Sequence, residues 1–392
     1  MIDVFRNHNR MKRLTCLFLI ISGCLCQATA QYKVVIRITS LPASPQASEV
    51  FIAGDFNNWN PSDPNSRLQK GAQGLFFFEG SNVPSGTYVY KFTRGSWETV
   101  ETNFKGQSID NRTLTITSDT MVSLTIEGWQ DAVKSAPPKV VSTASPQVRW
   151  LDTAFAIPQL ERSRRIWIYL PANYDKSGKR YPVLYLQDGQ NLFDAATSFA
   201  GEWGVDETLD SSGKGFIVVG IDNGGLKRMN EYNPNDHERF GKGEGREYLA
   251  FVARTLKPYI DRHYRTKSDQ KHTSIAGSSM GGLISFYAGI LYPDVFGNIG
   301  VFSPSFWIDP SLDSVIGQKV NNRLNKRQRY YFYAGQLEGQ EMVPDTYKIA
   351  NHLEKLTGQK YPVRVNENGR HNEPAWRQEF PRFIEWLSVE VN

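Results

Sequence analysis

The sequence has almost no cysteine: its three copies, Cys16, Cys24 and Cys26, all lie within the first 30 of 392 residues. If this segment is cleaved after Ala30, the mature chain carries no thiol. Disulfides, thiol catalysis and cysteine-based metal sites are then excluded. Histidines in H-x-x-x-H or H-E-x-x-H spacing and phosphate-cradling glycine motifs are also missing, so we predict no metal ion and no cofactor.

Charge of one sign is scarce as well. The net charge is +5, of which the first 30 residues carry +3, and no basic run is interleaved with aromatic residues. The sequence therefore predicts no nucleic-acid partner.

Residues 1–30 are typical of an export signal. A basic MKR triplet precedes the apolar run LTCLFLIISG, which is too short to span a bilayer, and ATA before Gln31 fits a cleavage site. We therefore expect a secreted or periplasmic protein. In the alternative, ISGC is a lipoprotein box, Cys24 is lipidated, and the protein is anchored to the outer face of a membrane.

The rest of the chain divides in two by its pattern. Residues 31–127 alternate short apolar runs with Gly, Asn and Pro turns, which indicates an all-β, immunoglobulin-like sandwich. Residues 128–147 are rich in Ser, Pro and Ala, as linkers are. Over residues 148–392, buried strands alternate with amphipathic helices, which predicts an α/β domain with a doubly wound, mostly parallel sheet.

The stretch GSSMG, residues 277–281, carries the clearest catalytic signal. It fits G-x-S-x-G with Ser279 at its centre, between a predicted strand and a predicted helix. This context favours a nucleophilic serine on a tight turn over an ordinary Gly/Ser connection. The backbone N–H of Met280 would then donate to an oxyanion, and the amide of Gln190, in the early loop YLQDGQNLFD, is our candidate for the second donor.

A serine nucleophile needs a histidine base and an acid, which in such a fold follow it along the chain. His371, in a loop after the predicted strand YPVRVNEN, fits better than His352, which lies within a predicted helix. Glu338 comes just after the predicted strand RYYFYAG and is our candidate acid. Glu341 and Asp345 in the same stretch remain rivals.

Several motifs of the second domain together resemble the "Putative esterase" family of α/β-hydrolases, which includes feruloyl, acetyl-xylan and enterobactin-type trilactone esterases. The resemblance covers about residues 148–390 and rests on RYPVLYLQDGQNLF, EWGVDETL, VVGIDNG, RMNEYNP, SIAGSSMGG and VFSPSFW. It implies a serine hydrolase with Ser279, Glu338 and His371 as its triad. The acid in this family is often Asp, so the Glu departs from the family pattern.

The first domain has a resemblance of its own. VFIAGDFNNWNP, GTYVYKFTRGSW and DNRTLTI resemble the glycogen-binding module attached to starch enzymes. The resemblance implies sugar contacts by Trp59, Lys91, Trp97 and Asn111, since flat aromatic rings stack on the apolar face of a sugar. The alternative is a domain that only packs against its neighbour, with Trp59 in its core.

Two tryptophans of the second domain, Trp203 and Trp307, follow predicted strands and are candidates for the wall of an acyl or sugar pocket. Positions in the core are the alternative for both.

The sequence thus predicts a secreted, cofactor-free serine carboxylesterase that acts on feruloyl or acetyl esters of polysaccharides or oligosaccharides. Two alternatives stay open. One is a siderophore trilactone esterase, in which Lys227, Arg228 and Arg370 would form a cationic pocket. The other is a glycan-binding protein whose hydrolase domain is catalytically weak.

Overall fold

The structure is a computed structural model that describes residues 30–43, 47–57, 59–71, 74–132, 141–199, 201–238, 240–320 and 327–389. The predicted export signal, with its three cysteines, lies outside these ranges apart from Ala30. None of the helices within them combines the length and apolarity that a membrane crossing requires.

The first domain is an all-β sandwich, as its short apolar runs predict. One sheet has the strand order β3-β4-β1-β8 and a second has the order β2-β5-β7, while β6 pairs with β9. The elements are β1 (Gln31–Ser40), β2 (Phe51–Gly54), η1 (Asp55–Asn57), η2 (Pro64–Ser66), β3 (Gln69–Lys70), β4 (Phe76–Pro84), β5 (Gly86–Thr93), η4 (Trp97–Thr99), β6 (Glu101–Thr102), β7 (Arg112–Ile116), β8 (Thr120–Thr125), β9 (Gly128–Trp129) and η5 (Gln130–Ala132).

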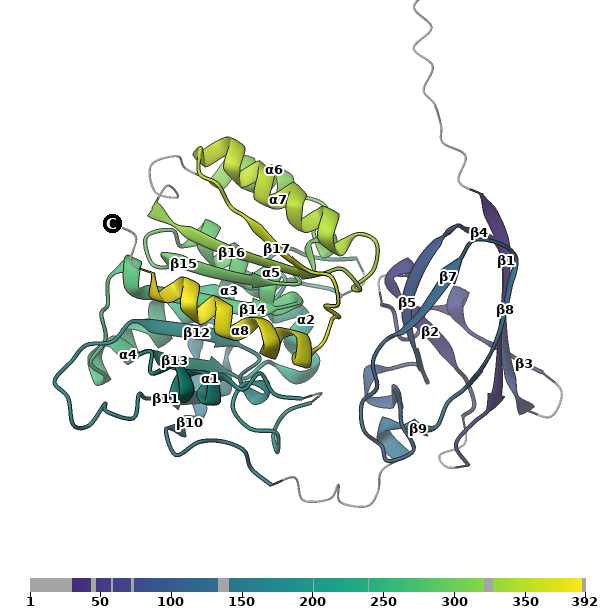
Figure 1. Cartoon of the computed structure of the whole chain (residues 1–392), viewed down its shortest axis with the longest axis horizontal. Helices are drawn as coiled ribbons and strands as arrows, with labels where there is room; N and C mark the ends of the chain where they lie inside the picture. Colours follow the sequence, from purple (N-terminus) through teal and green to yellow (C-terminus); the bar gives the residue numbers. More distant parts are fainter. Residues whose placement is uncertain are drawn as a thin grey trace, which may run out of the picture.

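Strand β5 shows how this sandwich presents its two faces. Tyr90 and Phe92 point into the core, where they are 3% and 0% exposed. Because side chains alternate along a strand, Val89 and Lys91 point to the opposite face. In Figure 1 the sheet that contains β5 and β2 lies on the side of the sandwich next to the second domain, and β1 and β8 lie on the far side.

The predicted linker, residues 128–147, is wrong at its start. Strand β9 pairs with β6, and the ring of Trp129 is 0% exposed, so the sandwich extends to Ala132. Burying the apolar ring of Trp129 stabilises this segment as part of the sandwich, although polar residues surround it in sequence. Further along, the Ser142 hydroxyl donates to Asp194 at 2.8 Å, which fixes this end of the segment to the second domain.

The second domain is an eight-stranded sheet in the order β10-β11-β13-β12-β14-β15-β16-β17. Strand β11 runs antiparallel to β10 and β13, and all other pairs are parallel, which confirms the α/β class. The strands are β10 (Val148–Ile157), β11 (Arg162–Tyr169), β12 (Val183–Gln187), β13 (Ile217–Ile221), β14 (Thr273–Ser278), β15 (Asn298–Phe302), β16 (Arg329–Gly335) and β17 (Val363–Asn366).

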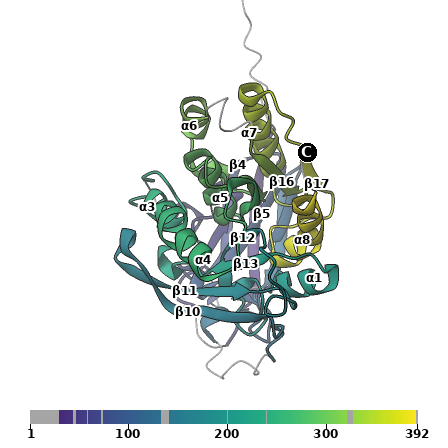
Figure 2. The same cartoon turned by 90° about the vertical axis from the view of Figure 1, so that its left-hand side faces the viewer.

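Helices cover both faces of this sheet, and each face has its own apolar core (Figure 2). Helices α3 to α7 pack on one face, while α1 and α8 pack on the other. The helices are α1 (Val205–Ser212), α2 (Arg228–Glu231), α3 (Gly245–Phe251), the π-helix η9 (Val252–Leu256), α4 (Lys257–His263), α5 (Met280–Leu291), α6 (Leu312–Lys319), α7 (Met342–Thr357) and α8 (Glu373–Ser388), with short 3₁₀ turns η6 (Pro158–Leu160), η7 (Gly189–Asn191), η8 (Gly225–Lys227), η10 (Gln270–His272) and η11 (Phe306–Ile308).

Candidate active site

Ser279 stands on a sharp turn between β14 and α5. Its backbone has φ 58° and ψ −123°, a region that residues with a side chain rarely adopt. The turn closes because its neighbours are glycines: a Cβ on Gly277 would lie 2.7 Å from the carbonyl oxygen of Gly281. The Ser279 N–H donates to the Phe302 carbonyl at 3.0 Å, which fixes the strained turn to β15. The predicted strand–turn–helix context of the motif is therefore present.

The loop after β15 contacts the Ser279 turn directly. The hydroxyl oxygens of Ser279 and Ser305 lie 3.2 Å apart, and the Ser305 N–H donates to the Ser279 carbonyl at 3.1 Å. Ser305 is buried, whereas Ser279 is half-buried. Ser305 lies within VFSPSFW, one of the stretches that carry the family resemblance, but nothing in the sequence assigned it a role.

His371 and Glu338 form a hydrogen-bonded pair at the adjacent strand ends. The Nδ1 atom of His371 lies 2.9 Å from Oε2 of Glu338, whose side chain is 0% exposed. The other carboxylate oxygen accepts hydrogen bonds from the Gly335 N–H and the Ser303 hydroxyl, both at 2.7 Å. Three donors thus satisfy a carboxylate that water does not reach.

The rival candidates for base and acid lie elsewhere. Glu341 immediately precedes helix α7, and Asp345 lies in its first turn. His352, later in the same helix, lies 3.1 Å from Asp313 on α6. In the described structure, Glu338 is therefore the acid that meets His371.

Two further residues support the pair. Ser303, whose φ of 43° is unusual for a residue with a side chain, accepts a hydrogen bond from the indole N–H of Trp376 at 3.0 Å. The ring of Trp376 also packs edge-on against His371, with the ring centroids 5.2 Å apart. Nothing in the sequence assigned a role to either residue. The positive φ of Ser303 becomes visible only in the folded chain.

The two predicted oxyanion donors lie at the starts of helical turns. Met280 is the first residue of α5, where helix geometry leaves backbone N–H groups without intrahelical partners. Gln190 lies in η7, directly after Gly189. A Cβ on Gly189 would lie 2.8 Å from the backbone nitrogen of Asp222. The Gln190 side-chain oxygen accepts the Asn223 N–H at 3.2 Å, so the segment that follows β13 contacts this loop.

Asp188, just before this loop, forms an ion pair with Arg228. Arg228 donates to both of its carboxylate oxygens, at 2.7 and 2.8 Å, and the Asn223 side chain donates at 2.7 Å. The Asp188 N–H donates to the hydroxyl of Tyr232 at 3.2 Å, and the guanidinium of Arg228 lies over the Tyr232 ring. The charge of Arg228 is therefore balanced inside the protein.

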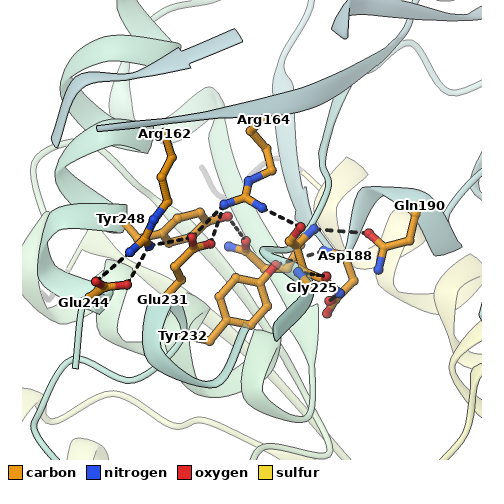
Figure 3. Close-up of polar contacts among 11 residues, drawn as sticks. Arg162, Arg164, Asp188, Gln190, Gly225, Glu231, Tyr232, Glu244 and Tyr248 are labelled. Atoms are coloured by element: carbon orange, nitrogen blue, oxygen red, sulfur yellow. Dashed lines mark hydrogen bonds and ion pairs between the residues drawn. The ribbon is translucent and has the colours of Figure 1, made fainter. Parts of the chain in front are cut away.

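A second ion-pair network lies behind Asn223. Arg164 donates twice to the buried Glu231 at 2.7 Å and once to the Asn223 carbonyl at 2.6 Å. Arg162 bridges Glu231 and Glu244, and its hydrogen bonds lower the pKa of Glu244 (Figure 3). This network connects strand β11 to the segment after β13, to helix α2 and to Glu244, which directly precedes α3.

The three cations proposed for an anionic substrate differ in their surroundings. Arg228 is paired with Asp188, and Lys227 is exposed. Arg370 is exposed and lines a small pocket beside His371.

That pocket lies between the two domains. Val89 and Asn111 of the first domain line it together with Leu337, Arg370, His371 and Asn372 of the second. Of the four residues assigned to sugar contacts, Asn111 therefore lies next to His371, and Lys91 lies on the same face of the sandwich as Val89. Trp59 and Trp97 pack against each other, with their ring centroids 6.3 Å apart, and Trp97 is 38% exposed.

The assignment of Trp203 to a substrate pocket is wrong. The ring is 3% exposed and packs between Phe302, Trp376 and Phe380 in the core beneath α1 and α8. Trp307 is half-buried against the core on the other face of the sheet, and its pocket role stays a prediction. Among the described residues, no cluster of three or more His, Cys, Asp or Glu side chains is arranged to bind a metal ion.

Comparison with known proteins agrees with this architecture. The model of the family described as "Putative esterase" matches residues 157–387. An enterochelin esterase from Shigella flexneri has a similar fold, with a TM-score of 0.52 and 16% identity over 91% of both chains.

Two relatives are similar over parts of the chain. An endo-1,4-beta-xylanase/feruloyl esterase of Xylanibacter ruminicola is 28% identical over 220 residues, which are 54% of this chain and 27% of that protein. An alpha-amylase of Niallia circulans is 41% identical over 100 residues, which are 25% of this chain and 8% of the amylase. The chain thus spans less than a third of the length of either enzyme.

Proposed function

Since the chain belongs to the "Putative esterase" family, we propose that it is a serine carboxylesterase with Ser279 as nucleophile, His371 as base and Glu338 as the acid that orients the base. One observation carries this proposal: the strained Ser279 turn and the His371–Glu338 pair lie at the carboxyl ends of the neighbouring strands β14, β15 and β16. In open α/β sheets this edge is where ligands bind.

The hydrogen bond between His371 and Glu338 determines how the base works. With Nδ1 directed to the carboxylate, the proton of the neutral ring is on Nδ1, and Nε2 is left to accept the proton of Ser279. Ser279 Oγ attacks the ester carbonyl carbon, and Nε2 then gives the proton to the alcohol oxygen as the ester C–O bond breaks. Water cleaves the acyl-enzyme by the same route, with His371 again as base.

The negative charge that develops on the carbonyl oxygen needs two donors. We assign these to the backbone N–H groups of Met280, at the start of α5, and of Gln190, in η7. The Asn223–Gln190 and Arg228–Asp188 contacts would keep the second donor in position as charge develops.

For the substrate, we propose feruloyl or acetyl esters of plant or other polysaccharides. Three observations support this class: the bifunctional xylanase/feruloyl esterase relative, the amylase relative, and a first domain that resembles a glycogen-binding module. The export signal expected at residues 1–30 would place the enzyme where such polymers occur.

The test is hydrolysis of p-nitrophenyl acetate, methyl ferulate, acetylated xylan, feruloylated arabinoxylan and a catecholate trilactone by the chain that begins at Gln31. Ser279→Ala should abolish turnover, whereas Ser314→Ala, which removes an exposed hydroxyl on α6, should not change it. The proposal predicts that an ester linked to a sugar is the best substrate. Preference for the trilactone would instead identify a siderophore esterase.

A folded wild-type protein that hydrolyses none of these esters would overturn the catalytic proposal. In that case, binding of the unchanged protein to insoluble glycans would identify a glycan-binding protein, the remaining alternative.

A further inference from the structure

We propose that the first domain completes the esterase active site, with Asn111 contacting the leaving alcohol and Asp110 positioning the His371 loop through Asn372. This inference rests on the proposed serine mechanism and adds to it the residues that select the alcohol part of the ester. The first domain is then a wall of the catalytic site and not a separate anchor.

The small pocket beside His371 carries the first step. Its lining comes from both domains, with Val89 and Asn111 on one side and the loop Arg370–Asn372 on the other. Val89 reaches this place because β5 directs its alternate side chains away from the sandwich core. The contact with the pocket is made by the face of the sandwich to which Val89 points.

The chemistry of the reaction assigns a role to this pocket. When the ester bond breaks, the imidazole of His371 must give its proton to the alcohol oxygen, so the alcohol leaves from beside this ring. A side chain that lines the space next to His371 therefore meets the alcohol and not the acyl group. Asn111 carries both a donor and an acceptor, which matches the hydroxyl groups of a sugar alcohol.

A hydrogen bond from Asn372 to Asp110 carries the second step. The Asn372 side-chain nitrogen donates to Asp110 Oδ1 at 2.8 Å, while its oxygen caps helix α8 by accepting the Ala375 N–H at 3.2 Å. The side chain next to His371 is thus held from both ends, once by its own helix and once by the first domain.

Other contacts hold the domains in this arrangement. Gln340 donates from its side chain to the Thr87 carbonyl at 3.3 Å, and Gly86 faces the same side chain, where a Cβ would lie 2.3 Å from its nitrogen. Burial lowers the pKa of Lys91, and the carboxyl of Glu373 in the other domain is among the charges that oppose this shift. Burial raises the pKa of Glu373.

This arrangement changes the interpretation of the glycan-module resemblance. Two of the four residues assigned to sugar contacts, Lys91 and Asn111, lie at the domain boundary beside the ester site. A sugar that contacts them can therefore be the sugar that carries the scissile ester. Trp59 and Trp97 form a separate aromatic pair, which this inference does not use.

The contact of Asn111 with the alcohol is tested by comparing esters of one acid with different alcohols. For Asn111→Ala, we expect kcat/KM on a feruloylated arabinose ester to fall about tenfold, because a buried polar contact is lost. On methyl ferulate, whose alcohol is too small to reach the side chain, the change should stay within about twofold. Equal effects on both esters, or no effect on either, would overturn the assignment.

The positioning role of Asp110 is tested by a pair of variants. Asp110→Ala removes the acceptor of the Asn372 hydrogen bond, so we expect kcat on methyl ferulate to fall about fivefold with KM unchanged. Asp110→Asn keeps an acceptor oxygen and should restore kcat to within about twofold of wild type. A merely structural role of Asp110 would change thermal stability without this difference between Ala and Asn, and that result would contradict the inference.

The control is Met121→Ala, which alters an exposed residue on β8 in the other sheet of the sandwich. This variant should leave unchanged both the kcat/KM values on the two ferulate esters and kcat on methyl ferulate. The outcomes also separate the two proposals. If Ser279→Ala abolishes activity while the Asn111 and Asp110 variants behave as wild type, the serine mechanism stands and only the role of the first domain fails.

Discussion

Glu338 joins His371 to the core of the esterase domain. One carboxylate oxygen contacts the imidazole at 2.9 Å, and the other accepts from Ser303 and from the backbone of Gly335. A carboxylate held by three donors cannot rotate away from the ring without breaking them. The histidine is therefore oriented by a group that is itself fixed to the end of β16.

Replacing Glu338 by Gln should lower kcat by about 10³–10⁴-fold, because the amide stabilises neither the required tautomer nor the imidazolium. Glu338→Asp keeps the charge but shortens the side chain by one methylene, so a smaller loss is expected. Initial rates on the best ester of the panel measure both. A Glu338→Gln enzyme within tenfold of wild type would show that another group orients His371.

Ser303 offers a test that separates hydrogen bonding from backbone strain. Ser303→Ala and Ser303→Gly both remove the hydroxyl that donates to Glu338, and each should lower kcat about tenfold. Because φ is 43° at this residue, the Gly variant should be more stable than the Ala variant by about 1 kcal/mol. Urea denaturation of the two variants measures this difference. An Ala variant as stable as the Gly variant would mean that this backbone is not strained.

Local patterns predicted the class of each domain and the strand–turn–helix context of Ser279, but not strand β9, which lies within the predicted linker. The alternating runs gave the sandwich, the strand–helix alternation predicted the α/β domain, and the turn around Ser279 follows from its glycines. Contacts between segments that are far apart in the sequence could not be predicted. Asp110 and Asn372 are separated by 262 positions in sequence, and neither belongs to a motif that indicates the other.

Trp203 shows the same limit for a residue to which the sequence assigned a role. A tryptophan after a strand has the same sequence signal whether its ring lines a pocket or fills the core. The structure places it in the core because the aromatic rings of α8 converge on it, and these rings come from a segment more than 170 residues later. A pattern within ten residues contains no information on that contact.

The core position of Trp203 has a measurable consequence. Trp203→Ala should lower the free energy of unfolding by about 3–5 kcal/mol, since it leaves a large cavity, while Trp203→Phe should lower it by less. The ratio of kcat/KM between two esters should be unchanged in the Phe variant. A shift in that ratio without a change in stability would restore the pocket role that the sequence suggested.

The Arg228–Asp188 pair predicts a non-additive pattern. Arg228→Gln leaves the buried carboxylate of Asp188 without its strongest partner, so the free energy of unfolding should fall by about 2–3 kcal/mol. Asp188→Asn in the same chain should recover part of that loss, because the unpaired charge is removed. The four proteins of the cycle are compared by urea denaturation. Strictly additive losses would mean that the two side chains do not interact.

Asp55, close to the domain boundary, predicts a dependence of stability on pH. Burial raises its pKa from 3.8 to about 6, although its Oδ2 accepts the Val89 N–H at 3.1 Å. A carboxyl with a higher pKa in the folded than in the unfolded protein favours folding while protonated, so its contribution is fully present below about pH 4 and is lost as the pH rises through about 6. The side chain of Asp55→Asn cannot ionise, so the variant does not lose this stability as the pH rises.

The melting temperature of Asp55→Asn should therefore exceed that of wild type by roughly 2–4 °C at pH 7.5, and the difference should shrink toward zero at pH 4. A difference of the same size at both pH values would show that the substitution acts through packing. A wild type that is more stable at pH 7.5 than the Asn variant would contradict the raised pKa, because it would require the ionised carboxylate to be the favoured form in the folded protein.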